Sequence, residues 1–234
     1  MDETQPRPSS SITVLVITAI VALLVGYGVA KAVESSNSNS MMASATPATN
    51  VAPTTTTKAA DLRSALVGLG VEHMQLTNQA IDAALDGNAD APALKTSLIA
   101  NGTSISGAIG SIYGSNVQTA FQGLWNAHLT DFVNYAVAGK KGDAAGKKAA
   151  MDDINANYTV PIAKLLSGAN PNLPNATLLT AFGDHVTMTA AIIDDHNAGN
   201  YTKEATDLIA ADTHIQGLMS TLAGAIVTQY PEKF

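Results

Sequence analysis

The chain has 234 residues, of which 46% are hydrophobic and 13% are charged, and its 12 basic and 19 acidic side chains give a net charge of −7. This acidic balance, with no basic stripe, argues against nucleic-acid binding, because phosphate backbones attract positively charged surfaces. The lack of cysteine excludes disulfides, zinc ribbons, iron–sulfur clusters, covalently attached haem, thiol nucleophiles and cysteine-linked lipid anchors.

The first predicted element is an apolar segment over residues 12–33, which follows an N-terminal tail of residues 1–11. Residues 12–30 carry no charged side chain, and a helix of this length spans about 28 Å, close to the hydrocarbon thickness of a bilayer. The segment therefore predicts a membrane partner, either as a single-pass anchor or as a signal peptide. Ala30-Lys31-Ala32 matches a signal-peptidase site, so cleavage after Ala32 would give a secreted protein, whereas the length of the segment favours an uncleaved anchor.

Residues 34–58 form the next segment, rich in Ser, Thr, Asn, Ala and Pro. Such a composition buries too little apolar surface to offset the entropy of ordering, so it predicts a flexible linker. Residues 59–234 are then expected to form one domain outside the cytoplasm, held at the cell membrane or secreted.

Within residues 59–234, apolar side chains recur every three or four positions, which is typical of amphipathic helices. Six such stripes are separated by predicted turns near residues 86–88, 113–116, 139–142, 168–174 and 198–200. Pro161 interrupts the fourth stripe and should kink that helix or shift its start. The pattern predicts an all-α fold, a six-helix bundle with short loops.

The histidines add a second regularity to this pattern. Taking the helices as hairpins around loops near residues 88, 142 and 200, polar residues stand at about equal distances on either side of each loop, which places them at one height in an antiparallel pair. The first member of each pair recurs after 55 and then 57 residues, as expected for an internal repeat of three related antiparallel hairpins. The pairs are His73 with Asn101, His128 with Asn157, and His185 with His214.

These positions lie on or beside the apolar stripes, so they predict a polar belt across the core. Imidazole suits copper, zinc, iron and nickel, and helical bundles place such ligands on facing helices. One interpretation is therefore a metal site with His73, His128, His185 and His214 as ligands. Asn101 and Asn157 would be supporting polar groups, and thioethers near the histidines favour copper, particularly Cu(I), over zinc. The thioethers belong to Met74, Met188 and Met219.

Two other interpretations remain open. The belt could serve only packing, in a structural or protein-interaction module on a stalk whose protein partner the sequence does not reveal, since buried polar groups normally satisfy one another. With a cavity beside the belt, the domain could instead carry haem or a small ligand. His196, which follows two aspartates near a helix end, is expected to be a solvated capping residue. The residues form no recognisable catalytic constellation, so the chain is not predicted to be an enzyme.

Two stretches resemble a known family. One runs from GAIGSIYG at 107–114 to FQGLWNAH at 121–128, and the other is QYPEKF at 229–234, together with Glu72-His73 and Asp184-His185. They are similar to exported bacterial all-helical proteins labelled copper-amine-oxidase-like, over about residues 61–234. The resemblance implies an exported helical domain associated with copper. It does not imply oxidase activity, because Asn157-Tyr158 lacks the flanking Thr and acidic residue of the Thr-x-x-Asn-Tyr-Asp/Glu motif that supplies the quinone cofactor of copper amine oxidases.

Overall fold

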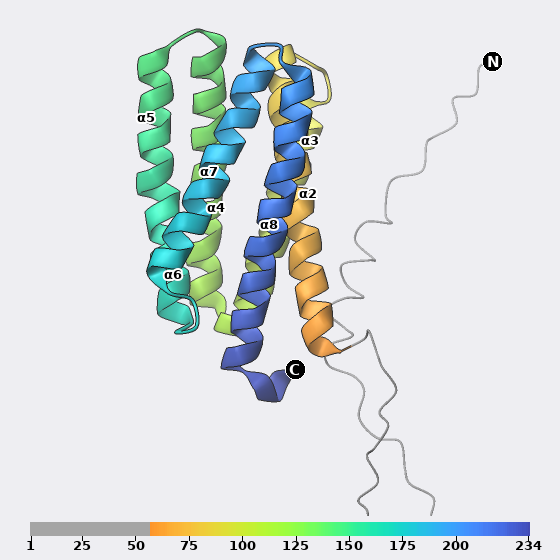
Figure 1. Cartoon of the computed structure of the whole chain (residues 1–234), viewed down its shortest axis with the longest axis vertical. Helices are drawn as coiled ribbons and strands as arrows, with labels where there is room; N and C mark the ends of the chain where they lie inside the picture. Colours follow the sequence, from red (N-terminus) through yellow and green to blue (C-terminus); the bar gives the residue numbers. More distant parts are fainter. Residues whose placement is uncertain (1–56) are drawn as a thin grey trace, which may run out of the picture. The chain divides into compact units, whose positions relative to one another are not determined.

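The computed structural model describes residues 57–234, in which the chain is almost wholly helical (Figure 1). The predicted tail, the membrane or signal segment and residues 34–56 of the predicted linker lie outside these residues. Because α5, η1 and α6 follow one another without a break, the described part contains six helical rods and no strand, which confirms the all-α prediction. The elements are α2 (Lys58–Asp86), α3 (Ala91–Tyr113), α4 (Ser115–Lys140), α5 (Ala144–Ile154), the π-helix η1 (Asn155–Thr159), α6 (Val160–Ala169), α7 (Asn175–Asn197), α8 (Tyr201–Gln229) and the 3₁₀-helix η2 (Pro231–Lys233).

The rods run alternately up and down as three antiparallel hairpins, whose loops lie at one end of the bundle (Figure 1). The hairpins are α2 with α3, α4 with α5–α6, and α7 with α8. Each rod packs on the next along the chain, and α8 returns to pack on α2. The first helix of each hairpin also contacts the other two first helices, so α2, α4 and α7 meet inside the bundle. Residues at mid-height on these three helices are therefore brought together.

The three hairpin loops share one turn geometry. Gly87, Gly142 and Gly199 have φ of 70°, 70° and 72°, a left-handed conformation that glycine adopts without steric cost. In each loop the residue after the glycine donates its backbone N–H to the carbonyl five residues earlier, at 2.8–2.9 Å. These bonds are the Schellman arrangement that ends a helix. The glycine-containing turns predicted from the sequence therefore end the first helix of every hairpin.

The interruption predicted at Pro161 takes the form of the π-helix η1 just before it. The N–H of Val160 bonds to the carbonyl of Asn155, five residues back, which widens the turn ahead of the proline ring. The wide turn also keeps buried side chains in line. The buried residues of this rod follow one another at a strict spacing of four. In a regular α-helix, each such step would turn the next side chain by about 40° around the helix axis. That row is Ala150, Ile154, Tyr158, Ile162 and Leu166.

Large apolar side chains fill the space between the rods. Trp125 and Phe132 of α4, Tyr158 of η1 and Phe182 of α7 are all buried within one continuous core. Among the described helices, α7 is long and apolar enough to cross a membrane by length and composition. Its residues Leu178, Phe182 and Ile192 are buried in this core.

Candidate metal centre

Three of the predicted histidines converge inside the bundle: His73 from α2, His128 from α4 and His185 from α7. Each side chain is at most 2% exposed, and the three can offer nitrogen atoms that all lie within 4.8 Å of one another. Each of these residues stands fourteen positions before the turn glycine of its own hairpin, about 21 Å along a helix. Identical turns and equal distances from those turns thus set the three imidazoles at one height. We call this group the histidine triad.

The spacing of the triad fits a small metal ion. The ring centroid of His73 lies 5.6 Å from that of His128 and 6.1 Å from that of His185. With metal–nitrogen bonds of about 2.0–2.1 Å, three imidazoles around one ion would have centroids about 5.5 Å apart. In the part of the chain that the structure describes, the triad could therefore hold a metal.

Each neutral imidazole of the triad has one nitrogen lone pair to offer. Among the described residues, His73 Nδ1, His185 Nδ1 and both nitrogens of His128 are buried without a well-formed hydrogen bond. Burial, and then the charge of His185, lowers the pKa of His128 to about 3, and burial lowers the pKa of His185 to about 4. The backbone of Leu124 and Trp125 lies close enough to His128 to oppose, in part, the lowering of its pKa. Burial, followed by the charges of the other two, also holds the pKa of His73 well below its usual value. At neutral pH the triad is uncharged, which is the form that binds metal.

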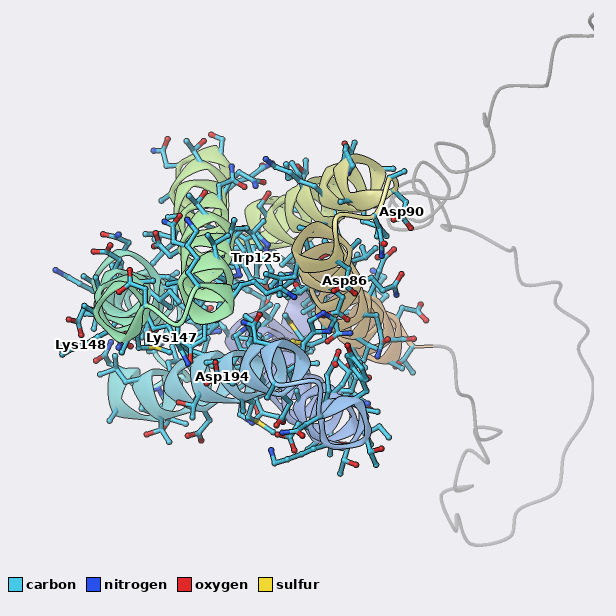
Figure 2. The ribbon with its side chains drawn as sticks, turned by 90° about the horizontal axis from the view of Figure 1, so that it is seen from above. Asp86, Asp90, Trp125, Lys147, Lys148 and Asp194 are labelled. Atoms are coloured by element: carbon cyan, nitrogen blue, oxygen red, sulfur yellow. The ribbon has the colours of Figure 1, made fainter. Side chains whose placement is uncertain are left out.

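Aromatic rings enclose the triad. The indole of Trp125 has its centroid 4.6 Å from that of His73 and 4.9 Å from that of His128, and the ring of Tyr158 stacks on His128 at 4.2 Å. Trp125 points into the middle of the bundle when it is viewed from the loop end (Figure 2). Gly102 of α3 makes room for this indole, because a Cβ there would lie 2.6 Å from Trp125 Cδ1. Tyr158, which stands next to Asn157, is a member of the site that the sequence pattern did not indicate.

The remaining members of the predicted belt bridge the two helices of each hairpin. The side-chain amide of Asn101 donates to the Leu69 carbonyl and to Glu72 Oε2, both at 3.0 Å. Asn157 Nδ2 donates to Asp131 Oδ2 at 3.4 Å, and His214 Nε2 lies 2.9 Å from the Ala181 carbonyl oxygen that accepts its hydrogen bond.

The groups that accept these hydrogen bonds all lie within four residues of a triad histidine. Asn101, Asn157 and His214 are therefore found at the height in the bundle that the sequence predicts. These three side chains form hydrogen bonds to the neighbouring helix and are not part of the group of converging nitrogens. The predicted set of four histidines is thus a group of three, with His214 close enough for its charge to lower the pKa of His185 after burial has done so.

The predicted methionines lie at different distances from the solvent. Met74, next to His73, is buried and lines a small cavity with Thr77 and Asp82, of about 10 Å³. Met219 is buried against Gly70, three residues before His73, and Met188 is partly buried against the core. Three acidic residues lie near the triad histidines in the sequence: Glu72 and Asp131 accept hydrogen bonds from Asn101 and Asn157, and Asp184 is exposed.

The prediction of a solvated His196 is wrong, because its side chain is buried at the loop end of the bundle. Its Nδ1 lies 3.0 Å from Asp82 Oδ1 and 3.2 Å from Glu204 Oε2, and its Nε2 lies 3.3 Å from Asp86 Oδ1. Burial, followed by a hydrogen bond with Glu204, raises the pKa of Asp82 to about 7.

We call Asp82, Asp86, His196 and Glu204 the loop-end cluster. A signal in the sequence was the pair Asp82 and Asp86 in the last turns of a helix, where the helix dipole disfavours acids.

Comparison with protein-family models, curated proteins and solved structures finds no match for this chain. The geometry of the site itself therefore has to indicate the function.

Proposed function

We propose that this protein binds one copper ion as Cu(I) through the histidine triad, in a helical domain held outside the cytoplasm by the segment at residues 12–33. The observation that carries the proposal is the convergence of three buried imidazoles with unpartnered nitrogens from three different hairpins. A buried polar group without a partner costs about 1–3 kcal/mol, and this cost falls on several nitrogens at one point. A bound cation would offset it.

Charge favours a monovalent ion over a divalent one. The triad consists of neutral donors, and among the described residues the converging group contains no carboxylate. The cost of burying an ion rises with the square of its charge, so an uncompensated Zn²⁺ or Cu²⁺ is disfavoured in such an apolar cage. Cu(I) carries a single charge and imidazole is a suitable ligand for copper. The resemblance to copper-amine-oxidase-like proteins points to the same metal.

Storage, buffering or delivery of copper follows more naturally than catalysis. Trp125 and Tyr158 close off the triad, and substrates need an open coordination position beside the metal. Haem is not favoured, because ligand pockets of that kind have volumes of several hundred Å³. The small cavity beside Met74 is about 10 Å³, the size of one water molecule.

A second candidate is a packing role in a structural or interaction module. The stacking of His128 on Tyr158, with ring planes 21° apart, favours it, because stacked aromatic pairs stabilise a core without any metal.

The test is a Cu(I) titration of the full-length chain in mild detergent under anaerobic reducing conditions, with a competing chelator. We expect one equivalent of Cu(I) and three-coordinate nitrogen ligation by X-ray absorption. His128→Gln and His185→Gln should each weaken binding more than 100-fold, since loss of merely a supporting group costs 10–100-fold.

His214→Gln is the matched control, because His214 lies next to the triad and is already hydrogen-bonded to Ala181. It should leave the affinity within about threefold. Circular dichroism checks that each variant is folded. A parent that stays copper-free under excess Cu(I), with variants that only melt earlier, would assign the triad to packing.

A further inference from the structure

The loop-end cluster is a second place where metal-binding side chains converge, separate from the triad. Its members come from the last two turns of α2, the last turn of α7 and the first turn of α8. Asp82, His196 and Glu204 can each offer one donor atom, and these atoms all lie within 4.8 Å of one another. Asp82 stands nine residues after His73 on α2, about 13 Å further along the helix. The two groups are therefore distinct sites.

The charges of the cluster do not balance. Three carboxylates face one imidazole, so even a protonated His196 leaves a net charge of −2 when all three are ionised. When Asp82, whose pKa burial raises to about 7, is protonated, the net charge is still −1. Glu204 is only 7% exposed, and the end of α2 carries no basic side chain in its last turn. Lys203 is the neighbouring cation, but its Nζ is bonded to Asp195 and Asp207, both at 2.8 Å. Excess negative charge at a helix C-terminus is unfavourable unless a cation is present.

The side chains are also oriented as in a metal site. His196 turns Nδ1 toward Asp82 and Glu204, while its Nε2 faces Asp86. Metal-ligating histidines commonly donate their second ring N–H to a carboxylate, which fixes the tautomer and the ring orientation. The other oxygen of Asp82 accepts a hydrogen bond from Asn78 at 2.7 Å, as ligating carboxylates usually do.

An independent observation comes from the small cavity next to Asp82. Thr77, which is 4% exposed, lines this cavity, and its hydroxyl oxygen has no hydrogen-bonding partner among the described residues. Asn78 lines the same cavity, and its amide oxygen is also without a hydrogen-bonding partner among the described residues. The cavity of about 10 Å³ has the size of one water molecule. Two neutral side chains with unpartnered oxygen atoms therefore lie next to Asp82, the carboxylate of the cluster that lines this cavity.

We propose that Asp82, His196 and Glu204 bind a divalent transition-metal ion such as Zn²⁺, with Asp86 as the carboxylate that orients the imidazole. One nitrogen and two carboxylate oxygens suit a divalent ion of borderline hardness. A metal needs the lone pair of His196 Nδ1, so any proton on Nδ1 leaves as the metal enters, and the proton on Nε2 stays for the bond to Asp86. The two carboxylate charges then compensate the charge of the ion, in contrast to the neutral triad. Asp82 and Asp86 are partly exposed, with side-chain exposures of 23% and 43%, which gives the ion a route from solvent.

The test is a Zn²⁺ titration of the full-length chain in mild detergent by calorimetry, with the triad variant His128→Gln/His185→Gln as the background. We expect one zinc equivalent in this background. Glu204→Gln and Asp82→Asn should each weaken it at least 100-fold, and Asp86→Asn about 10-fold. Asp207→Asn is the matched control, because Asp207 lies one turn further along α8 and accepts a hydrogen bond from Lys203. This substitution should leave zinc affinity unchanged. Because the triad is already removed, the result does not depend on the copper proposal.

Thermal melting without metal separates a metal site from a structural ion network. Glu204→Gln removes one of the crowded negative charges, so the metal-free variant should melt at the same temperature as the parent or higher. A structural role for the Glu204–His196 pair predicts the opposite, a lower melting temperature. Absence of zinc binding, zinc binding that survives Glu204→Gln and Asp82→Asn, or a lower melting temperature with unchanged zinc affinity would each overturn the proposal.

Discussion

Gly102 decides how closely the aromatic wall of the triad can approach α3. A Cβ at this position would lie 2.6 Å from Trp125 Cδ1 and 2.7 Å from Trp125 Nε1, and the indole is almost fully buried. The ring cannot give way without disturbing the two histidines that it contacts. A glycine inside a helix normally costs about 1 kcal/mol relative to alanine, so its presence here reflects packing against Trp125.

We therefore expect Gly102→Ala to destabilise the protein by about 1–3 kcal/mol, the usual cost of overpacking a filled core. Gly107→Ala on the same helix is the control, because a Cβ there meets nothing within 4 Å, and it should stabilise by up to about 1 kcal/mol. Urea unfolding, followed by the fluorescence of the single Trp125, measures both. Equal effects of the two substitutions would show that the indole has room to move.

At the scale of a single element, η1 holds Tyr158 against His128. The rod formed by α5, η1 and α6 keeps a buried row of residues at strict intervals of four. In a regular α-helix, the last side chain of this row would point about 160° away from the first around the helix axis. The wide turn of η1 takes back most of this rotation, so that Ile154 and Ile162 both remain buried. A π-turn of this kind acts as one extra residue within an α-helix.

Deletion of Ala156, an exposed residue of η1, should therefore convert the rod into a regular α-helix with spacings of four, three, four and four along its buried face. The protein should remain folded and lose no more than about 2 kcal/mol, a typical value for a single change. Deletion of Ala127 in the regular helix α4 is the comparison. It rotates every later core residue by about 100°, and the protein should not fold. Circular dichroism and thermal melting distinguish the two, and equal loss of structure would contradict this account of η1.

For the whole molecule, three neutral histidines buried at the meeting point of three hairpins make stability depend on pH. The unfolded chain protonates His185 near its usual pKa of 6.5, whereas burial lowers the folded pKa to about 4. Below pH 6.5 the unfolded state therefore binds more protons, and stability falls as the pH decreases toward 4. Asp82 acts in the opposite direction, because burial raises its folded pKa to about 7 and the folded state takes up its proton first.

Comparison of the parent with His185→Gln removes the contribution of Asp82 to the pH dependence of stability, because both proteins contain Asp82. Between pH 6.5 and 4.5 the metal-free parent should lose roughly 2–3 kcal/mol more than His185→Gln, at about 1.4 kcal/mol per pH unit for one histidine. Urea unfolding of both proteins at a series of pH values, with a chelator present, measures the difference. Parallel curves would mean that His185 is solvated in the folded state.

The sequence by itself determined the helices, the turns between them and the height of the polar belt. The apolar period and the turn glycines depend on local backbone geometry, and equal distances from a tight turn fix the register of an antiparallel pair whatever the neighbours are. For the same reason Asn101, Asn157 and His214 were predicted at the height where they are found.

Only the tertiary structure decided which belt side chains converge. The direction of a side chain around a helix depends on how the three hairpins pack, and α2, α4 and α7 meet inside the bundle, so their histidines point at one another while His214 bonds to Ala181. The burial of His196 was decided in the same way. Its partners lie on other helices, Asp82 and Asp86 on α2 and Glu204 on α8, and the packing of these helices on α7 brings them to His196.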